Sequence, residues 1–260
     1  MTTVLSEFAD FAETLVDASR EIILGYWRQD LEIIDKEDES PVTIADRTAE
    51  ARIREMIEAR YPDHGIAGEE YGRVRMDAEY VWSLDPVDGT KAFISGSPLF
   101  GTLVALLRNG SPVLGVVDVP AMSERWVGGE GLPTRLNGKP VKTRKGQPLN
   151  LATTGSTSPS MFRRGPDAER IARVHDAVKL PVWGGDCYLY GMLALGTIDL
   201  VIERGLSDYD YLAPAAMIKA AGGVVTGWEG EDLGIGTTDR VVAAGDPKLH
   251  AEVIRLLNET

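Results

Sequence analysis

Two carboxylates stand three residues apart within residues 79–96, which have the sequence EYVWSLDPVDGTKAFISG. Asp85 and Asp88 repel each other across so short a turn unless cations lie between them. Gly89 allows a tight turn after them, and the residues from Thr90 onward have the composition of a short helix, whose free N–H groups attract anions. Hard-cation ligands next to an anion-binding turn indicate magnesium together with phosphate. The structural alternative is that Asp88 caps the helix and Asp85 is an ordinary loop residue, because Asp-rich turns are common.

Short elements on either side must position these carboxylates. Residues 81–85 have the pattern of a buried strand, and the strand is predicted to end at Asp85 because Pro86 cannot donate a ladder hydrogen bond. The Ser-Gly-Ser-Pro run at 95–98 predicts that the helix at 90–94 stops there. The two aspartates should therefore lie side by side at the carboxyl end of a strand.

The hexapeptide Asp85-Pro86-Val87-Asp88-Gly89-Thr90 resembles the signature of the inositol monophosphatase family, which comprises magnesium-dependent, lithium-sensitive phosphatases. Four further segments fit that family in the same order, namely Lys36 with SPVTIAD at 40–46, Gly68-Glu69-Glu70, Gly184-Gly185-Asp186, and Tyr209-Asp210. They extend the resemblance from about residue 5 to about residue 258. It implies an α/β fold in which the layers form an αβαβα five-layer sandwich.

Transferred position by position, the resemblance makes Glu69, Asp85, Asp88 and Asp210 ligands of two or three magnesium ions, together with the main-chain carbonyl of Val87. A physical argument supports this set, since four carboxylates from distant segments share a small volume only if divalent cations neutralise them. Asp85 would bridge two metals. By its position alone, Asp210 fits a helix cap better than a ligand.

The resemblance also implies a reaction without a covalent phosphoenzyme. A metal-activated water attacks the phosphate, Thr90 accepts its proton, and Asp46 holds the Thr90 hydroxyl. Glu69 belongs to the catalytic set as well as to the metal ligands. The amides of Gly89 and Thr90 would hold the phosphate, and Lys36 would add to substrate binding.

Two departures from the inositol-specific pattern concern the substrate. Those members usually carry a tryptophan before the last metal-binding aspartate, whereas this chain has Tyr209. The segments GGDCY at 184–188 and GLSDYDYL at 205–212 resemble the histidinol-phosphate phosphatase branch, whose leaving group is a cationic amino alcohol with an imidazole. Acidic side chains suit such a cation, and Asp186, Glu203 and Asp210 are the predicted substrate contacts on that side. A helix cap is the alternative for Asp186.

These features predict a magnesium-dependent phosphomonoesterase that acts on L-histidinol phosphate in histidine biosynthesis. Inositol 1-phosphate is the alternative substrate. Sugar bisphosphates and nucleotides are disfavoured because they would require additional basic residues in the second half of the chain. A non-catalytic phosphate-binding or regulatory protein is the alternative of another class, and the water-activating pair of Asp46 and Thr90 argues against it.

Composition restricts the partners of the protein. The 260 residues include 27 Lys and Arg against 40 Asp and Glu, giving a net charge of −13 with no basic run, which argues against nucleic acid and anionic membranes. No segment approaches the ~20 apolar residues of a membrane span. The single cysteine, Cys187, excludes an internal disulfide, and the acidic N-terminal region does not have the pattern of a secretory signal. We therefore expect a cytoplasmic protein with a small phosphate monoester as substrate, and the resemblance implies a homodimer.

The remaining pattern gives the organisation of the chain. Apolar spacing predicts helices at 4–27 and 43–60, and Asn109-Gly110 predicts the turn of a hairpin at 100–119. The polar stretch 142–150 is a candidate hinge between an α+β lobe at 1–141 and an α/β lobe at 142–260 in which strands and helices alternate. The three histidines lie outside every motif and are expected to be surface or packing residues, namely His64, His175 and His250.

Overall fold

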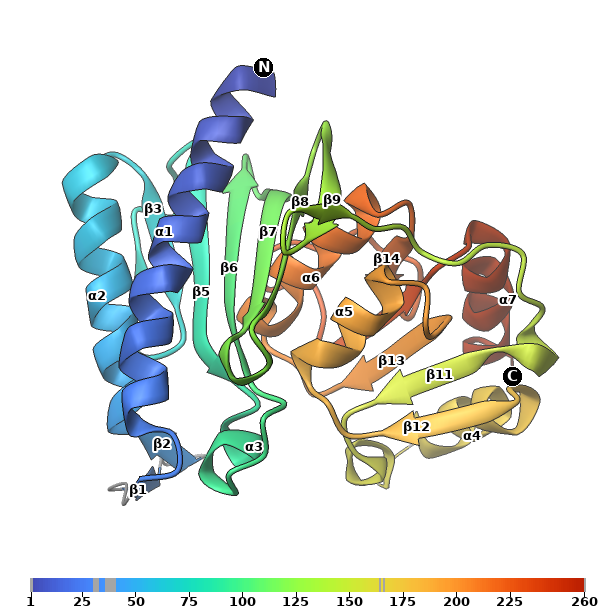
Figure 1. Ribbon diagram of the computed structural model, residues 1–260. Coiled ribbons are helices and arrows are strands. Elements are labelled where there is room, and N and C mark those ends of the chain that lie inside the picture. The colour runs from blue at the N-terminus through green and yellow to red at the C-terminus, as the bar shows by residue number, and fades with distance from the viewer. Residues whose placement is uncertain (1, 30–32, 36–40, 164, 166, 260) are drawn as a thin grey trace.

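The elements of the computed structural model stack in five layers (Figure 1). The structure describes residues 2–29, 33–35, 41–163, 165 and 167–259. Helices α1 (Thr2–Tyr26) and α2 (Ile44–Arg60) cover one face of an eight-stranded sheet. Helices α5 (Cys187–Ala194) and α6 (Asp208–Ala220) lie between this sheet and a five-stranded sheet, whose outer face is covered by α4 (Asp167–Ala177) and α7 (Pro247–Leu257). The predicted αβαβα arrangement is confirmed.

The eight-stranded sheet has the order β10-β9-β8-β7-β6-β5-β3-β4. Its strands, in chain order, are β3 (Gly65–Gly68), β4 (Gly72–Val74), β5 (Tyr80–Asp88), β6 (Gly101–Arg108), β7 (Ser111–Val119), β8 (Glu124–Gly129), β9 (Leu132–Leu136) and β10 (Lys139–Pro140). Helix α3 (Thr90–Ile94) follows β5, and the 3-10 turn η1 (Pro120–Met122) follows β7. A separate ribbon pairs β1 (Ile33–Asp35) with β2 (Pro41–Thr43).

The five-stranded sheet has the order β12-β11-β13-β15-β14. Its strands are β11 (Thr153–Ser156), β12 (Leu180–Trp183), β13 (Leu200–Arg204), β14 (Val224–Gly227) and β15 (Arg240–Ala244), and the 3-10 turns η2 (Leu149–Leu151) and η3 (Pro159–Phe162) flank β11. Strands β12 and β13 both pair with β11 in parallel, whereas β15 pairs antiparallel with β13 and β14. The division of the chain at residue 141 stays a prediction.

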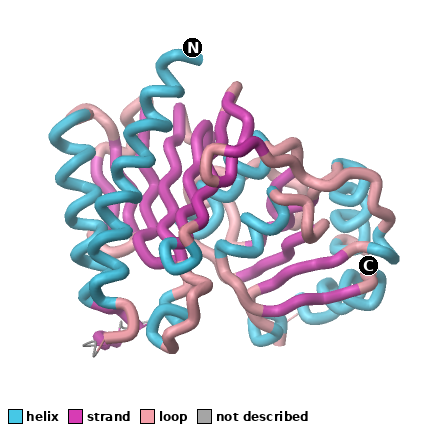
Figure 2. The backbone as a smooth tube through the Cα atoms, in the orientation of Figure 1, coloured by secondary structure: helices cyan, strands magenta, loops and turns pink. Residues whose placement is uncertain are grey.

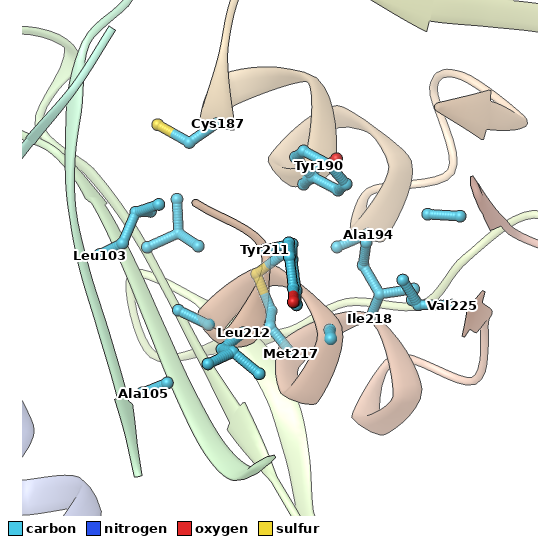
Figure 3. Close-up of a cluster of buried hydrophobic side chains, with 14 of the residues drawn as sticks. Leu103, Ala105, Cys187, Tyr190, Ala194, Tyr211, Leu212, Met217, Ile218 and Val225 are labelled. Atoms are coloured by element: carbon cyan, nitrogen blue, oxygen red, sulfur yellow. The ribbon is translucent and has the colours of Figure 1, made fainter. Parts of the chain in front are cut away.

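Strand β5 faces two hydrophobic cores, because successive side chains of a strand point to opposite sides of the sheet. Trp82 and Leu84 pack beneath α1 and α2, whereas Val81 belongs to the middle core that α5 and α6 fill. Figure 3 shows part of this middle core, in which Leu103 and Ala105 of β6 face Tyr211 and Leu212 of α6. Asp85 has the same strand parity as Val81, so its side chain is directed to the middle layer.

The prediction that the strand ends at Asp85 is wrong. Strand β5 continues through Pro86 to Asp88, and its register against β6 shifts between Asp85 and Asp88. A β-bulge is one of the few places where a sheet tolerates proline, because the local ladder is already interrupted. The carbonyl of Pro86 accepts a hydrogen bond from Thr102 Oγ1 at 2.8 Å.

Several other elements agree with the pattern of the sequence. Helices α1 and α2 begin and end within two residues of their predicted limits. The hairpin β6–β7 turns at Asn109 and Gly110, whose φ angles of 50° and 81° suit a two-residue hairpin turn. Strands β2 and β4 were not predicted. Figure 2 shows the strands of the two sheets in magenta with the cyan helices beside them. Among the described residues, no helix combines the length and the apolar character needed to cross a bilayer.

Candidate active site

The candidate site lies where two parallel strands end together. Strands β3 and β5 pair in parallel with Gly68 opposite Leu84, and the N–H of Glu69 donates to the Leu84 carbonyl at 3.2 Å. Glu69 and Asp85 each follow the paired residue of their strand. Parallel pairing therefore brings these two carboxylates to the same edge of the sheet, although they are 16 residues apart in the sequence.

Two groups of carboxylates meet at Asp85. One ligand oxygen from each of Asp46, Glu69 and Asp85 lies within 4.8 Å of the others, and the same holds for Asp85, Asp88 and Asp210. The structure thus brings together all four carboxylates that sequence reasoning proposed as ligands. Asp46 joins them as a possible ligand in addition to its predicted role beside Thr90.

Burial and crowding raise the pKa values of these carboxyls. Asp85 is 2% exposed, and desolvation followed by the charge of Glu69 raises its pKa well above the ordinary 3.8. Desolvation followed by the charge of Asp186 does the same for Asp88, and desolvation raises the pKa of Asp210 to about 7. The cluster therefore lacks sufficient positive charge from the protein itself.

A hard cation fits this set of oxygens. Asp85 Oδ1 is buried and has no hydrogen-bond partner among the described residues. An orphaned buried carboxylate oxygen is costly in a folded protein unless a cation or a proton satisfies it. Oxygen ligands without sulfur or histidine suit magnesium, calcium or manganese rather than zinc or copper.

Asp88 does not cap the helix that follows it. Gly89 is the N-cap residue of α3, and no side chain caps that helix. Asp88 Oδ2 instead accepts a hydrogen bond of 2.7 Å from the N–H of Cys187, the first residue of α5. The structural alternative for Asp88 is therefore wrong, and its carboxylate connects the edge of the first sheet to the middle layer.

Asp210 caps a helix and also lies in the carboxylate cluster, so the cap and ligand positions that sequence reasoning treated as alternatives do not exclude each other. Helix α6 begins at Asp208 rather than at the predicted residue 211, with Ser207 as its N-cap. Asp210 Oδ2 accepts a hydrogen bond of 2.8 Å from the Ser207 N–H in a capping box. The same carboxylate belongs to the group around Asp85 and Asp88.

Gly89 and Thr90 directly follow Asp88 at the start of α3. Thr90 Oγ1 donates to the Val87 carbonyl at 3.1 Å. Gly89 has φ 79° and ψ 39°, and a Cβ at this position would lie 3.1 Å from the Leu99 carbonyl oxygen and 3.2 Å from the Asp186 carboxyl. Only glycine suits both the left-handed backbone and this close approach. Asp46, 1% exposed, stands in the first turn of α2 as predicted.

The two predicted cation-binding acids lie on the second-sheet side. Asp186 is the N-cap of α5 by position, with φ 43°, but its side chain makes no capping hydrogen bond. The cap alternative for Asp186 is therefore confirmed for its position, although its carboxylate does not bond the helix N–H groups. Burial raises the Asp186 pKa while Lys91 opposes the rise. Glu203 is 2% exposed and accepts hydrogen bonds of 2.9 Å from both Thr157 N–H and Tyr190 O–H. Burial raises the Glu203 pKa to about 7.

The other predicted residues are easily placed. His64 Nδ1 accepts from Trp82 Nε1 at 3.1 Å, His250 pairs with Thr226 at 2.9 Å, and His175 packs edge-on against Trp183. None of these histidines belongs to the two described carboxylate groups. Lys36 lies outside the described residues, so its predicted substrate contact stays a prediction.

Sequence reasoning missed Glu50 of α2, which is fully buried beside the loop that carries Glu69. The signal for it was the spacing of four residues from Asp46, which places both carboxylates on one face of the helix. A charged residue so placed is buried only if it has partners.

The five-layer fold and the paired carboxylate groups define a metal-dependent phosphatase. The chain belongs to the inositol monophosphatase family, whose sequence profile matches residues 4–260. It is 46% identical, over 98% of its length and 76% of the relative, to a chloroplastic bifunctional phosphatase, IMPL2, of Arabidopsis thaliana. It is 32% identical to a histidinol-phosphatase of Chlorobaculum parvum, over 83% of this chain and 84% of that one. The structure of an inositol monophosphatase from Zymomonas mobilis superimposes with a TM-score of 0.90 at 39% identity, covering 98% of both chains.

Proposed function

We propose that this phosphatase is a magnesium-dependent phosphomonoesterase that acts on L-histidinol phosphate in histidine biosynthesis. The observation that carries the proposal is an acidic wall formed by Asp186 and Glu203 beside the carboxylate cluster. The Asp186 carboxyl lies 3.2 Å from the position that a Gly89 Cβ would occupy, and its charge raises the pKa of Asp88. A cationic leaving group suits such a wall, whereas the uncharged ring of an inositol phosphate gains nothing from its charge. The likeness to a histidinol-phosphatase supports the same substrate.

The residues of the chain divide into three tasks under this proposal. Glu69, Asp85, Asp88, Asp210 and the Val87 carbonyl would hold two or three magnesium ions, and Asp85, which belongs to both carboxylate groups, would be the ligand that they share. Bound magnesium supplies Lewis acidity toward the phosphate and toward the attacking water.

Thr90 and Gly89 handle the phosphate and the proton. The Thr90 hydroxyl directs its hydrogen to the Val87 carbonyl, which leaves the lone pairs of Oγ1 available to accept a hydrogen bond from water. We assign Thr90 and Asp46 as a proton-accepting pair: the Thr90 hydroxyl would turn from the Val87 carbonyl to Asp46, and Oγ1 would accept a proton from water as it passes its own to the Asp46 carboxylate. The amides of Gly89 and Thr90 would be the phosphate donors. Lys36 is proposed as a further substrate contact.

Asp186 and Glu203 would recognise the leaving group in different ways. Glu203 is buried and both of its oxygens accept hydrogen bonds, so we propose that it acts on the substrate ammonium through its charge. Asp186 retains an exposed edge and can contact the ammonium directly. Thr157 donates its N–H to Glu203 at 2.9 Å, and its side chain lowers the pKa of Asp186, so Thr157 lies beside both acids.

The test is phosphate release from L-histidinol phosphate, inositol 1-phosphate, fructose 1,6-bisphosphate and adenosine 3′,5′-bisphosphate, with magnesium and with EDTA. We expect a kcat/KM for histidinol phosphate at least about a hundredfold above the others, equivalent to ~2.7 kcal/mol, and its loss in EDTA. Preference for inositol 1-phosphate would retain the metal chemistry and contradict the roles of Asp186 and Glu203. That alternative is favoured by the likeness to the Zymomonas mobilis enzyme. No turnover of any ester would support a non-catalytic phosphate-binding protein.

A homodimer and a cytoplasmic location are part of the same proposal. Light scattering on the purified protein tests the first, and a monomer at micromolar concentration would contradict it. Cell fractionation tests the second.

A further inference from the structure

Glu50 is a fully buried carboxylate that sequence reasoning left without a role. It stands one turn after Asp46 on α2 and faces the turn between β3 and β4. It belongs to neither of the two carboxylate groups found among the described residues. Burying a carboxylate is costly, so its contacts should reveal what it stabilises.

Within the part of the chain that the structure describes, the hydrogen bonds of Glu50 go to the loop that carries Glu69 and to a neighbouring arginine. Glu50 Oε2 accepts from Glu70 N–H at 2.7 Å, and Oε1 accepts from Tyr71 N–H at 3.1 Å. Arg54, one further turn along α2, donates its Nε–H to Oε1 at 2.7 Å. The Arg54 guanidinium also donates to the Gly72 carbonyl, so side chains of α2 form hydrogen bonds to the backbone of residues 70–72.

Gly68 gives an independent indication of the same contact. A Cβ at Gly68 would lie 2.0 Å from Glu50 Oε1 and 2.7 Å from an Arg54 nitrogen. The absence of a side chain at this position is therefore what allows the carboxylate to reach the loop. The residues on both sides of Glu69 thus meet Glu50, Gly68 by close approach and Glu70 by its N–H.

We propose that Glu50 is a positioning residue that fixes Glu69 for metal binding. It acts through the backbone of the loop, and its charge is balanced by Arg54. The effect is confined to the group of Asp46, Glu69 and Asp85, because Asp88 and Asp210 are held by contacts to Cys187 and Ser207 instead. The inference rests on the proposed metal site.

The test is calorimetric titration of the metal-free protein with Mg²⁺, and with Mn²⁺ as a tighter-binding probe. The variant Glu50→Gln keeps the size of the side chain but places an amide donor against one of the three donors that Glu50 now accepts from. We expect the affinity of one class of metal site to fall at least about tenfold, which is the loss that mutation of a group supporting a metal ligand typically causes. The affinity of a second class of site should be unchanged. The KM for substrate at saturating metal should stay within about twofold.

Asp199→Asn is the matched control. Asp199 is 1% exposed and also accepts three hydrogen bonds, two from Arg144 and one from Thr153 N–H, but it precedes β13 and lies in neither carboxylate group. It should lower the melting temperature as Glu50→Gln does and leave every metal affinity unchanged. A loss of metal affinity in Asp199→Asn equal to that in Glu50→Gln would mean that general destabilisation is the cause, and would overturn the proposal.

Gly68→Ala provides a second variant if Glu50→Gln does not fold. Its methyl group would displace the Glu50 carboxylate without removing any charge, and the same selective loss of metal affinity is expected. Wild-type metal binding in a folded Glu50→Gln or Gly68→Ala protein would refute the role of Glu50. Failure of the wild-type protein to bind either metal would refute the proposed metal site instead.

Discussion

Replacing Asp210 by asparagine should stabilise the metal-free protein. Burial raises the Asp210 pKa from 3.8 to about 7. At pH 8 the carboxylate is ionised in both states, and its ionised form is less favourable in the folded protein than in the unfolded chain. The difference of about 3 in pKa corresponds to roughly 4 kcal/mol at most. Asp210 retains a partly exposed edge, and asparagine loses a favourable interaction of about 0.5 kcal/mol with the α6 dipole. We therefore expect a net gain of about 2 kcal/mol.

Asparagine should keep the local structure intact, because its carbonyl oxygen can still accept the hydrogen bond from Ser207 N–H. A gain of that size corresponds to a melting temperature roughly 4–8 °C higher. The measurement is thermal unfolding in EDTA at pH 8. Asp208→Asn is the control two residues earlier, since the Asp208 carboxylate pairs with Arg73 at 2.6 Å and its loss should lower the melting temperature.

The sign of the effect is set by pH. Below about pH 4 the carboxyl is protonated in both states, and the variant should equal the wild type. Between about pH 4 and pH 7 the unfolded wild type ionises first, so the wild type loses stability and the advantage of Asp210→Asn grows. Above pH 7 the advantage is constant. A variant less stable than the wild type at pH 8, or an advantage independent of pH, would refute the reasoning.

Three further predictions concern turnover. Asp85→Asn should reduce kcat at least about a thousandfold and abolish the tighter metal binding in calorimetry, because both carboxylate groups share this residue; near-normal kinetics would contradict a shared ligand. Thr90→Ala should lower kcat about a hundredfold with little change in KM, and an effect confined to KM would argue against proton transfer through the hydroxyl. Glu203→Gln should lower kcat/KM for histidinol phosphate about tenfold more than for an uncharged ester such as inositol 1-phosphate, and equal losses on the two esters would exclude a role in cation recognition.

The sequence predicted the first two helices and the hairpin well because they depend on local patterns, whereas the five-layer arrangement was implied by the family resemblance. The apolar spacing of α1 and the Asn109-Gly110 turn are local signals, and no tertiary contact overrides them. Strand β4 was missed because all three of its residues are exposed and only pairing with β3 defines it. The end of β5 was misplaced because the bulge that admits Pro86 is a property of the pairing with β6.

The site was predictable in composition but not in its local geometry. Asp85 and Asp88 were found because a short motif contains both. Whether Asp210 caps α6 or joins the cluster could not be decided from its position, and the structure gives the reason, since one carboxylate does both. Glu50 was missed because its spacing from Asp46 indicates only a shared helix face. Its partners are backbone N–H groups 20 and 21 residues further along the chain, which carry no sequence signature.

The arrangement of these carboxylates makes the metal part of the stability of the fold as well as of its chemistry. Glu50, Cys187 and Ser207 hold the ligand-bearing segments from three separate elements, so the carboxylates cannot move apart to relieve their repulsion. A pKa raised by this crowding means that ionisation of the carboxyl destabilises the folded chain. Binding of a cation to the ionised carboxylates offsets this loss of stability. A divalent cation at about a hundred times its dissociation constant would add ~2.7 kcal/mol to the stability of the folded state. Asp210→Asn and magnesium should therefore stabilise the protein through the same repulsion, and their effects should not add. Addition of magnesium at pH 8 should raise the melting temperature of the wild type. The variant should have a higher melting temperature without the metal and gain little when it is added.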